Sequence, residues 1–210
     1  MKTLRYAMSG KVSSKDTADP AFGMSQHDGR FTSAVYDQLA QFDESLKAQP
    51  MLAESWGAND KADVWTFKLR QDVTFHDGSK FTSKDVVYTF KRLIDPATAS
   101  PGAGNLTMLD PDGIKAVDDY TVEFKLTQPN VDLPLALITR QTWIVKDGAS
   151  GDDLKSNGIG TGPFTQKEFR PGETPSIYEK NPNYWQSGLP KVDVLSCCPS
   201  ASWPRASPPC

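Results

Sequence analysis

Residues 64–94 read VWTFKLRQDVTFHDGSKFTSKDVVYTFKRLI, a strand pattern followed by a helix pattern. Over residues 64–69, the apolar side chains of Trp65, Phe67 and Leu69 alternate with more polar ones. Successive side chains of a strand point to opposite faces of its sheet. The alternation therefore predicts a strand over residues 64–69 with one buried face.

The second half of this stretch predicts a turn and then an amphipathic helix. The turn is predicted at residues 76–78 (His-Asp-Gly), because a glycine after an aspartate readily takes the positive φ that tight turns need. Residues 82–85 (Thr-Ser-Lys-Asp) resemble a capping box with aspartate in place of glutamate. An apolar stripe at helical spacing follows and comprises Val86, Val87, Phe90, Leu93 and Ile94.

Short elements are predicted on both sides of this stretch. Alternation predicts strands over residues 3–8, 114–117, 121–126, 164–169 and 176–180. Helical spacing predicts a helix around residues 35–42 and one or two helical turns over residues 133–138. Glycine-rich composition predicts long loops at residues 97–113 and 147–162. Short strands with occasional helices indicate an α/β fold class of the mixed α+β kind.

Composition and charge exclude several classes of protein. Of the 210 residues, 38% are hydrophobic and 23% are charged, which is typical of a globular chain rather than a disordered one. The formal net charge of −3 argues against a nucleic-acid-binding surface as the main function. No apolar run approaches the roughly 20 residues that a membrane-spanning helix needs.

No motif predicts a catalytic, metal or cofactor site. The two histidines lie at residues 27–29 and 76–78, both His-Asp-Gly, which we interpret as turns because no nucleophile motif accompanies them. Two histidines with scattered carboxylates do not form a metal motif. Residues 158–163 (GIGTGP) lack the following helix that a phosphate-binding glycine loop requires. We therefore expect no enzyme activity, no metal and no cofactor.

Arg140 and Trp143 are the ligand-binding candidates that the residue pattern itself favours. Several aromatic side chains could line a cleft, but Trp65 lies on an alternating strand and is expected in the core. Trp143 follows the charged loop residue Arg140 and is less easily assigned to a core. We therefore expect these two side chains to face a ligand.

Five segments resemble, in order and approximate spacing, the peptide/nickel/opine-type extracellular solute-binding proteins of ABC importers. They are QPMLAESW (49–56), WTFKLR (65–70), VTFHDGSKFTSKDVV (73–87), GTGPF (160–164) and NPNYW (181–185). The resemblance covers about residues 3–195. It implies the first lobe of a bilobal periplasmic-binding-protein-like fold, with the second lobe absent. In that fold, residues 3–45 and 158–195 form the lobe-one core and residues 46–157 form an inserted subdomain.

The resemblance also implies a ligand-binding cleft on this lobe. It places three regions near the cleft: the loop after the first strand, the start of the early helix and the Gly-Thr-Gly segment. Arg140 corresponds to a region from which some relatives reach a ligand carboxylate, and an arginine guanidinium suits that role. The residues that the resemblance places near the cleft are Met8, Ser9, Gly10, Lys11, Tyr36, Thr161 and Gly162.

The function implied by the resemblance is that of the substrate-binding component of an ABC-type importer for oligopeptides or similar small solutes. Such a protein is a periplasmic or extracellular membrane-associated monomer that docks on transmembrane permease subunits, although this sequence shows no signal peptide. With one lobe the chain encloses less of a ligand, so we expect impaired binding. Two alternatives stay open: a hydrolase that uses His76 and Asp77, or a stand-alone structural or interaction domain.

Residues 196–210 (SCCPSASWPRASPPC) differ in composition from the rest of the chain. They contain all three cysteines, four prolines and four serines, without alternation or helical spacing. We expect this tail to be disordered, and a reading frame shifted near residue 196 or a natural disordered tail would each account for it. The adjacent Cys197 and Cys198 do not have the spacing of zinc ligands.

Overall fold

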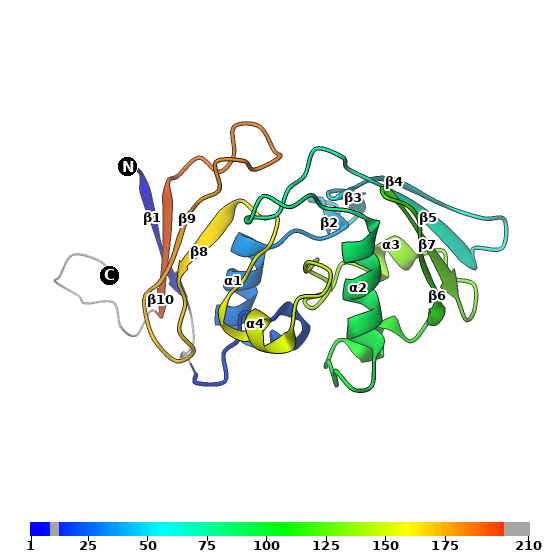
Figure 1. Cartoon of the computed structure of the whole chain (residues 1–210), viewed down its shortest axis with the longest axis horizontal. Coiled ribbons are helices and arrows are strands. Elements are labelled where there is room, and N and C mark those ends of the chain that lie inside the picture. Colours follow the sequence, from blue (N-terminus) through cyan, green and yellow to red (C-terminus); the bar gives the residue numbers. More distant parts are fainter. Residues whose placement is uncertain (9–12, 200–210) are drawn as a thin grey trace.

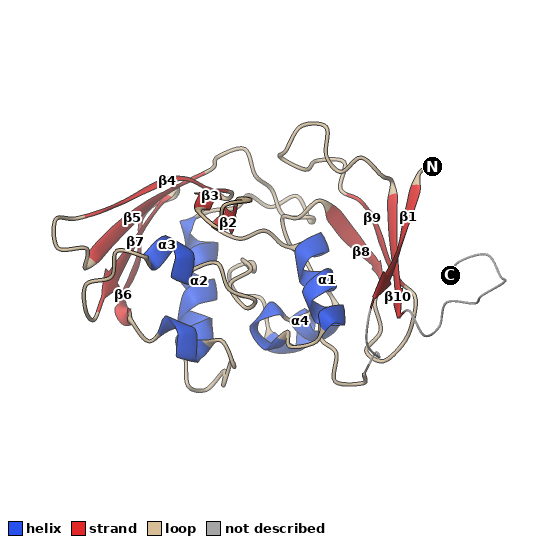
Figure 2. Ribbon diagram, turned by 180° about the vertical axis from the view of Figure 1, so that it is seen from behind, coloured by secondary structure: helices blue, strands red, loops and turns tan. Residues whose placement is uncertain are grey.

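The computed structural model describes residues 1–8 and 13–199 of the chain. Two four-stranded sheets stand at opposite ends of an elongated molecule, and the helices lie between them (Figure 1). Figure 2 shows the same arrangement from behind, with α1 (Gln26–Val35) and α4 (Gly151–Ser156) near one sheet and α2 (Ser83–Ile94) near the other. This architecture confirms the mixed α/β fold class.

The first sheet joins the two ends of the described chain. Its strand order is β1 (Thr3–Met8), β10 (Val194–Pro199), β9 (Ser176–Lys180) and β8 (Phe164–Glu168). β1 runs parallel to β10, whereas β10 with β9 and β9 with β8 form antiparallel pairs. The strands predicted near both ends of the chain are therefore confirmed.

The second sheet is antiparallel and contains the strand predicted over residues 64–69. Trp65, Phe67 and Leu69 of that strand are buried, which confirms the predicted alternation. A two-stranded hairpin of β2 (Ala40–Phe42) and β3 (Ala48–Pro50) precedes this sheet in the chain. The strand order of the sheet is β4 (Ala53–Ala58), β5 (Val64–Leu69), β7 (Thr121–Leu126) and β6 (Leu109–Asp118).

The turn and the helix predicted after β5 are confirmed. Gly78 has a φ of 83°, in the region that favours glycine. At the start of α2, the Asp85 carboxylate accepts a hydrogen bond from the Thr82 main-chain N–H (2.7 Å) as part of a capping box. The side chains of Val86 and Phe90 are buried on the face of α2 that packs against the second sheet.

The helix predicted around residues 35–42 is wrong, because the helix lies earlier in the chain. Ser25 Oγ accepts a hydrogen bond from the Asp28 N–H (3.0 Å), and the Asp28 carboxylate accepts one from the Ser25 N–H (2.9 Å). This capping box starts α1 at residue 26, so residues 27–29 form part of its first turn rather than the predicted loop turn. After Val35 the chain extends and then forms β2.

Two predicted loops contain regular structure. Residues 97–113 include a 3-10 helix (Ala103–Leu106) and the first residues of β6. Residues 147–162 include α4, where Ser150 Oγ accepts a hydrogen bond from the Asp153 N–H (3.1 Å). The helical turn predicted over residues 133–138 is α3 (Leu133–Ala136). Across the described part of the chain, no helix is long and apolar enough to cross a membrane.

The buried apolar side chains form two clusters. The larger cluster lies between the second sheet and α2, where the rings of Phe90 and Phe124 meet edge to face at 5.1 Å. The smaller cluster lies between the first sheet and α1, where the ring centroids of Phe31 and Tyr178 are 5.9 Å apart. Each sheet therefore has its own apolar core.

The predicted division into a lobe-one core (3–45 and 158–195) and an inserted subdomain (46–157) stays a prediction, and both clusters draw residues from both parts. Ala21 and Leu39 belong to the larger cluster, although the prediction assigns them to the lobe-one core. Val145 and Leu154 belong to the smaller cluster, although the prediction assigns them to the inserted subdomain.

Residues 196–199, which were predicted as part of a disordered tail, belong to β10. Ser196, Cys197 and Cys198 are buried in β10, between β1 and β9. A sheet pairs main-chain groups, so a sequence of serine and cysteine does not prevent it. The prediction of disorder is wrong for residues 196–199, and residues 200–210 lie outside the described residues.

Candidate ligand-binding site

A surface hollow opens between α1 and the loop that follows α3. Its volume is about 510 Å³, within the usual range for a pocket that holds a small molecule. Phe42 of β2 is one of its lining residues, and 45% of this residue is exposed. We call this cavity the α1 hollow; its principal lining side chains are Arg30, Gln38, Phe42, Thr139, Arg140 and Trp143.

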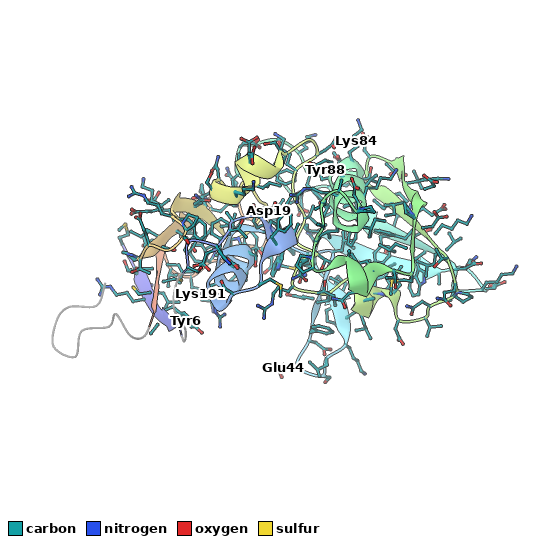
Figure 3. All side chains as sticks on the ribbon, turned by 90° about the horizontal axis from the view of Figure 1, so that it is seen from below. Tyr6, Asp19, Glu44, Lys84, Tyr88 and Lys191 are labelled. Carbon is teal, nitrogen blue, oxygen red and sulfur yellow. The ribbon has the colours of Figure 1, made fainter. Side chains whose placement is uncertain are left out.

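Figure 3 labels Tyr6 and Glu44, which lie close in contact or in sequence to Arg30 and Phe42 of the α1 hollow. Tyr6 of β1 and Glu44 of the turn between β2 and β3 lie on one side of this view, and Lys84 of α2 lies on the opposite side. Arg30 contacts Tyr6, and Phe42 is the last residue of β2, directly before the turn that carries Glu44.

The structure brings the two pattern-based candidates, Arg140 and Trp143, into this one hollow. The exposed Arg140 side chain donates a hydrogen bond from Nη1 to the Met24 carbonyl (2.8 Å), which holds its guanidinium near the start of α1. Trp143 is half-buried against the smaller cluster and keeps part of its surface in the hollow. A charged donor group and a flat apolar surface thus lie on the same wall.

Gln38 holds the loop that carries Arg140. Its Nε2 donates hydrogen bonds to the Thr139 carbonyl (2.6 Å) and to Thr142 Oγ1 (2.9 Å). Thr142 Oγ1 also accepts a hydrogen bond from the Thr139 N–H (3.0 Å). No sequence signal predicted this role, because a single glutamine in a connecting segment has no local pattern.

Arg30 is a second arginine on the wall of the hollow that the sequence did not reveal. Its Nη2 donates a hydrogen bond to the Tyr6 hydroxyl (2.7 Å), and its guanidinium carbon lies 4.6 Å from the centre of the Tyr6 ring. The prediction missed Arg30 because it missed α1, the helix that places this residue beside the hollow.

Three residues that the resemblance placed near a cleft are buried instead. Tyr36 has no exposed surface, its hydroxyl donates a hydrogen bond to the Ala18 carbonyl (3.3 Å), and burial raises its pKa. Thr161 is 1% exposed, and Gly162 is buried with its N–H bonded to the Val35 carbonyl (2.9 Å). Within the described structure these residues pack in the interior, and their predicted role near a ligand stays a prediction.

Asp37 explains why the Gly-Thr-Gly segment is buried. Its carboxylate accepts hydrogen bonds from Thr161 Oγ1 (3.0 Å), Tyr184 Oη (3.2 Å) and Trp185 Nε1 (3.0 Å). Burial raises the pKa of Asp37, although these three hydrogen bonds act in the opposite direction. The carboxylate thus joins the Gly-Thr-Gly segment and the Asn-Pro-Asn-Tyr-Trp segment (181–185) to the residues after α1.

His76 bonds to the main chain rather than to a nucleophile. Its Nε2 lies 3.0 Å from the Gly162 carbonyl, and the Gly160 N–H points to its Nδ1 at 3.4 Å. These partners assign the proton to Nε2, because a carbonyl only accepts and an N–H only donates. Asp77 pairs with Lys146 (2.6 Å) instead of with the imidazole. Among the described residues there is also no group of three side chains suited to hold a metal ion.

The remaining predicted site residues follow the first strand. Met8 is the last residue of β1, opposite Pro199 of β10. Ser9, Gly10 and Lys11 lie outside the described residues. Their predicted role stays a prediction.

Comparison with known proteins supports the family resemblance. Residues 47–198 match the family model described as bacterial extracellular solute-binding proteins, family 5 Middle. The chain is 32% identical over 188 residues to the periplasmic oligopeptide-binding protein OppA of Escherichia coli (strain K12), covering 80% of this chain and 34% of that protein. The chain thus spans about a third of the length of this relative.

Solved structures give the same result. OppA of Burkholderia pseudomallei matches with a TM-score of 0.82 and 25% identity, over 95% of this chain and 42% of that chain. MoaA of A. tumefaciens R10, solved in complex with mannopinic acid, matches with a TM-score of 0.82 and 31% identity, over 93% of this chain and 40% of that chain. The family model covers more than half of the sequence, so the chain belongs to the bacterial extracellular solute-binding proteins of family 5.

Proposed function

We propose that this chain forms one wall of the solute-binding component of an ABC-type importer for oligopeptides or similar small solutes. The observation that carries the proposal is that Arg140 and Trp143 line one surface hollow. A guanidinium offers several N–H donors and an indole offers a flat apolar surface, a combination suited to a small polar solute. The relatives named above, an oligopeptide-binding protein and a protein that holds mannopinic acid, favour solutes of this kind.

The fold supports the lobe arrangement that the resemblance implies. The first sheet with the smaller cluster would form the core of one lobe, and the second sheet with α2 would form an inserted subdomain. A second lobe, corresponding to the length of the relatives that this chain does not match, would cover the α1 hollow. Its closure would bury the solute from the other side.

An uncovered hollow implies weak binding by this chain alone. Ligand pockets usually bury most of their ligand, and the burial offsets the loss of the ligand's freedom. The α1 hollow touches a solute from one side, so water keeps access to the other. We expect dissociation constants weaker than micromolar for this chain with any short peptide.

The partner and the location follow from the same proposal. We infer a monomer that works outside the cytoplasm, in the periplasm or attached to the outer face of the membrane, and delivers its solute to transmembrane permease subunits. The periplasmic relative supports this location. A hydrolytic role for His76 is not favoured, because both ring nitrogens bond to the Gly160–Gly162 main chain.

Titration of the isotope-labelled chain with trialanine, followed by nuclear magnetic resonance, tests the site. We expect saturable shifts of the Trp143 indole and the Arg140 guanidinium, at peptide concentrations in the millimolar range. Arg140→Gln should weaken the binding about fivefold, because it removes a charge-assisted contact at an exposed position.

Arg170→Gln is the matched control, because Arg170 is exposed and pairs with Glu168 and Glu173 outside the hollow. It should leave the peptide affinity unchanged. Shifts confined to other surfaces would contradict the site. Calorimetric binding at micromolar or tighter affinity would contradict the expectation of one-sided contact.

A further inference from the structure

The α1 hollow carries positive charge on a chain whose net charge is −3. Two arginines, Arg30 and Arg140, line it, and no aspartate or glutamate is among its lining residues. Cations around a concave surface raise the local concentration of anions. The charge of the hollow is therefore opposite in sign to that of the whole molecule.

Neither arginine has a carboxylate partner within the described residues. Arg140 donates to main-chain carbonyls, and Arg30 donates to the Tyr6 hydroxyl. By contrast, Arg70 forms two hydrogen bonds to Asp72, at 2.9 and 2.8 Å. A guanidinium has five N–H donors, so Arg30 and Arg140 both retain donors and an uncompensated charge for a ligand.

The hydroxyl of Thr139 adds an unsatisfied polar group to the same wall. Its Oγ1 is buried and has no hydrogen-bond partner in the described structure, although Thr139 lines the hollow and precedes Arg140. Buried hydroxyls almost always have a partner, since leaving one unpaired costs stability. A ligand oxygen in the hollow would supply that partner once the Thr139 side chain turns toward the hollow.

We infer that the α1 hollow selects solutes that carry two carboxylates. Arg140 contacts one carboxylate, and Arg30 is the specificity-determining contact for the second. Arg30 gives up only its contact with the partly exposed Tyr6 when it turns to a ligand. Phe42 and Trp143 contact the uncharged part of the solute. The inference rests on the proposed function and narrows it to a substrate class.

Three peptides of nearly equal shape test this selectivity on the full chain. N-acetyl-Phe-Glu carries two carboxylates, N-acetyl-Phe-Gln carries one, and N-acetyl-Phe-Gln amide carries none. Magnetic resonance titrations at low ionic strength give the three dissociation constants. We expect the affinity to fall about threefold to fivefold with each carboxylate removed, the range for exposed ion pairs, and the differences to shrink at high salt.

Substitutions separate the two arginines. Arg30→Gln should remove the difference between the peptides with two carboxylates and one. In Arg140→Gln only Arg30 remains to bind a carboxylate. One of the two affinity differences among the three peptides should therefore disappear in this variant as well. Arg170→Gln, the control outside the hollow, should retain both steps, and thermal unfolding of each variant should show that the fold is kept.

The outcomes distinguish this inference from the proposed function. Equal affinities for the three peptides, with shifts at Trp143, would overturn the selectivity and leave the solute-binding site standing. If the Arg30→Gln variant still distinguishes all three peptides by affinity, the role of Arg30 is wrong. If none of the peptides, nor trialanine, shifts residues of the hollow at tens of millimolar, both the inference and the proposed site are wrong.

Discussion

The two glycines of the Gly-Thr-Gly segment lie directly against the main chain at the end of α1. A Cβ atom built at Gly160 would lie 2.0 Å from the Val35 carbonyl oxygen, and one at Gly162 would lie 2.5 Å from the Val35 carbonyl carbon. The segment therefore needs glycine because it passes directly against the end of α1. Thr161, between them, bonds to Asp37 in the interior rather than to a ligand.

Gly160→Ala should strongly destabilise the protein, since overpacking against rigid main chain cannot relax through a side-chain rotation. We expect a loss of at least about 2 kcal/mol in the free energy of unfolding. Gly104→Ala is the control, because a Cβ there meets nothing within 4 Å. Urea unfolding of both variants measures the difference, and similar midpoints for the two would show that the close approach at Gly160 is not rigid.

At the scale of elements, α2 and α1 show what local sequence can and cannot predict. Both helices begin with a capping box, Thr82 with Asp85 and Ser25 with Asp28. α2 also has an unbroken apolar stripe, so the sequence predicted it correctly. α1 contains Gly29 and several polar residues, so its stripe is short and the stronger spacing after it misled the prediction. In β10, composition hid a strand whose pairing depends on the main chain.

Asp28→Ala should destabilise α1 and the loop before it. The Asp28 carboxylate accepts hydrogen bonds from the N–H groups of Thr17 (2.8 Å), Met24 (3.0 Å) and Ser25 (2.9 Å). Loss of a buried capping group typically costs about 1–2 kcal/mol. The measurement is the free energy of unfolding in urea.

Asp152→Ala is the matched control for that measurement, because Asp152 lies in the first turn of α4 but is exposed and pairs with Lys155. It should leave the free energy of unfolding unchanged within error. If Asp28→Ala and Asp152→Ala lose the same free energy of unfolding, the negative charge in the first helical turn is the cause. The three hydrogen bonds to the Asp28 carboxylate would then not be.

At the scale of the whole molecule, the candidate site depends on contacts that no local pattern contains. Gln38 bonds to Thr139, which is 101 residues away in sequence, and Arg30 bonds to Tyr6, which is 24 residues away. The residue pattern found Arg140 because a charged loop residue stands out alone. It could not find Gln38 or Arg30, because their roles exist only after the two cores pack together.

The free energy of unfolding should fall in acid because of His76, which bonds to the main chain of residues 160–162. Burial lowers the pKa of His76 in the folded protein below the ordinary value of 6.5, so the unfolded chain takes up a proton first as the pH falls. The contribution of His76 to stability is complete above about pH 6.5 and is lost below it, by at most about 1.4 kcal/mol per pH unit. Protonation also places a hydrogen on Nδ1, facing the Gly160 N–H.

The free energy of unfolding in urea, measured between about pH 7.5 and pH 5.5, tests this dependence, because the range brackets the ordinary histidine pKa. His76→Gln, whose amide does not titrate, should lose less stability over that range than the natural protein. The nearby Asp77, with its pKa lowered to about 2 chiefly by Lys146 and Ser79 against the opposing effect of burial, titrates below this range. Equal slopes in the natural protein and His76→Gln would contradict the assignment.

The position of β1 has a consequence for the order in which the protein can be assembled during its synthesis. Within the described structure, β1 pairs with β10 alone, and Thr3 lies opposite Val194. A chain that emerges from its amino end therefore releases its first strand long before the partner strand exists, whereas β4, β5, β6 and β7 all lie within residues 53–126. The second sheet can close while translation continues. β1 is therefore synthesised first among the strands but can pair only after β10 has been made.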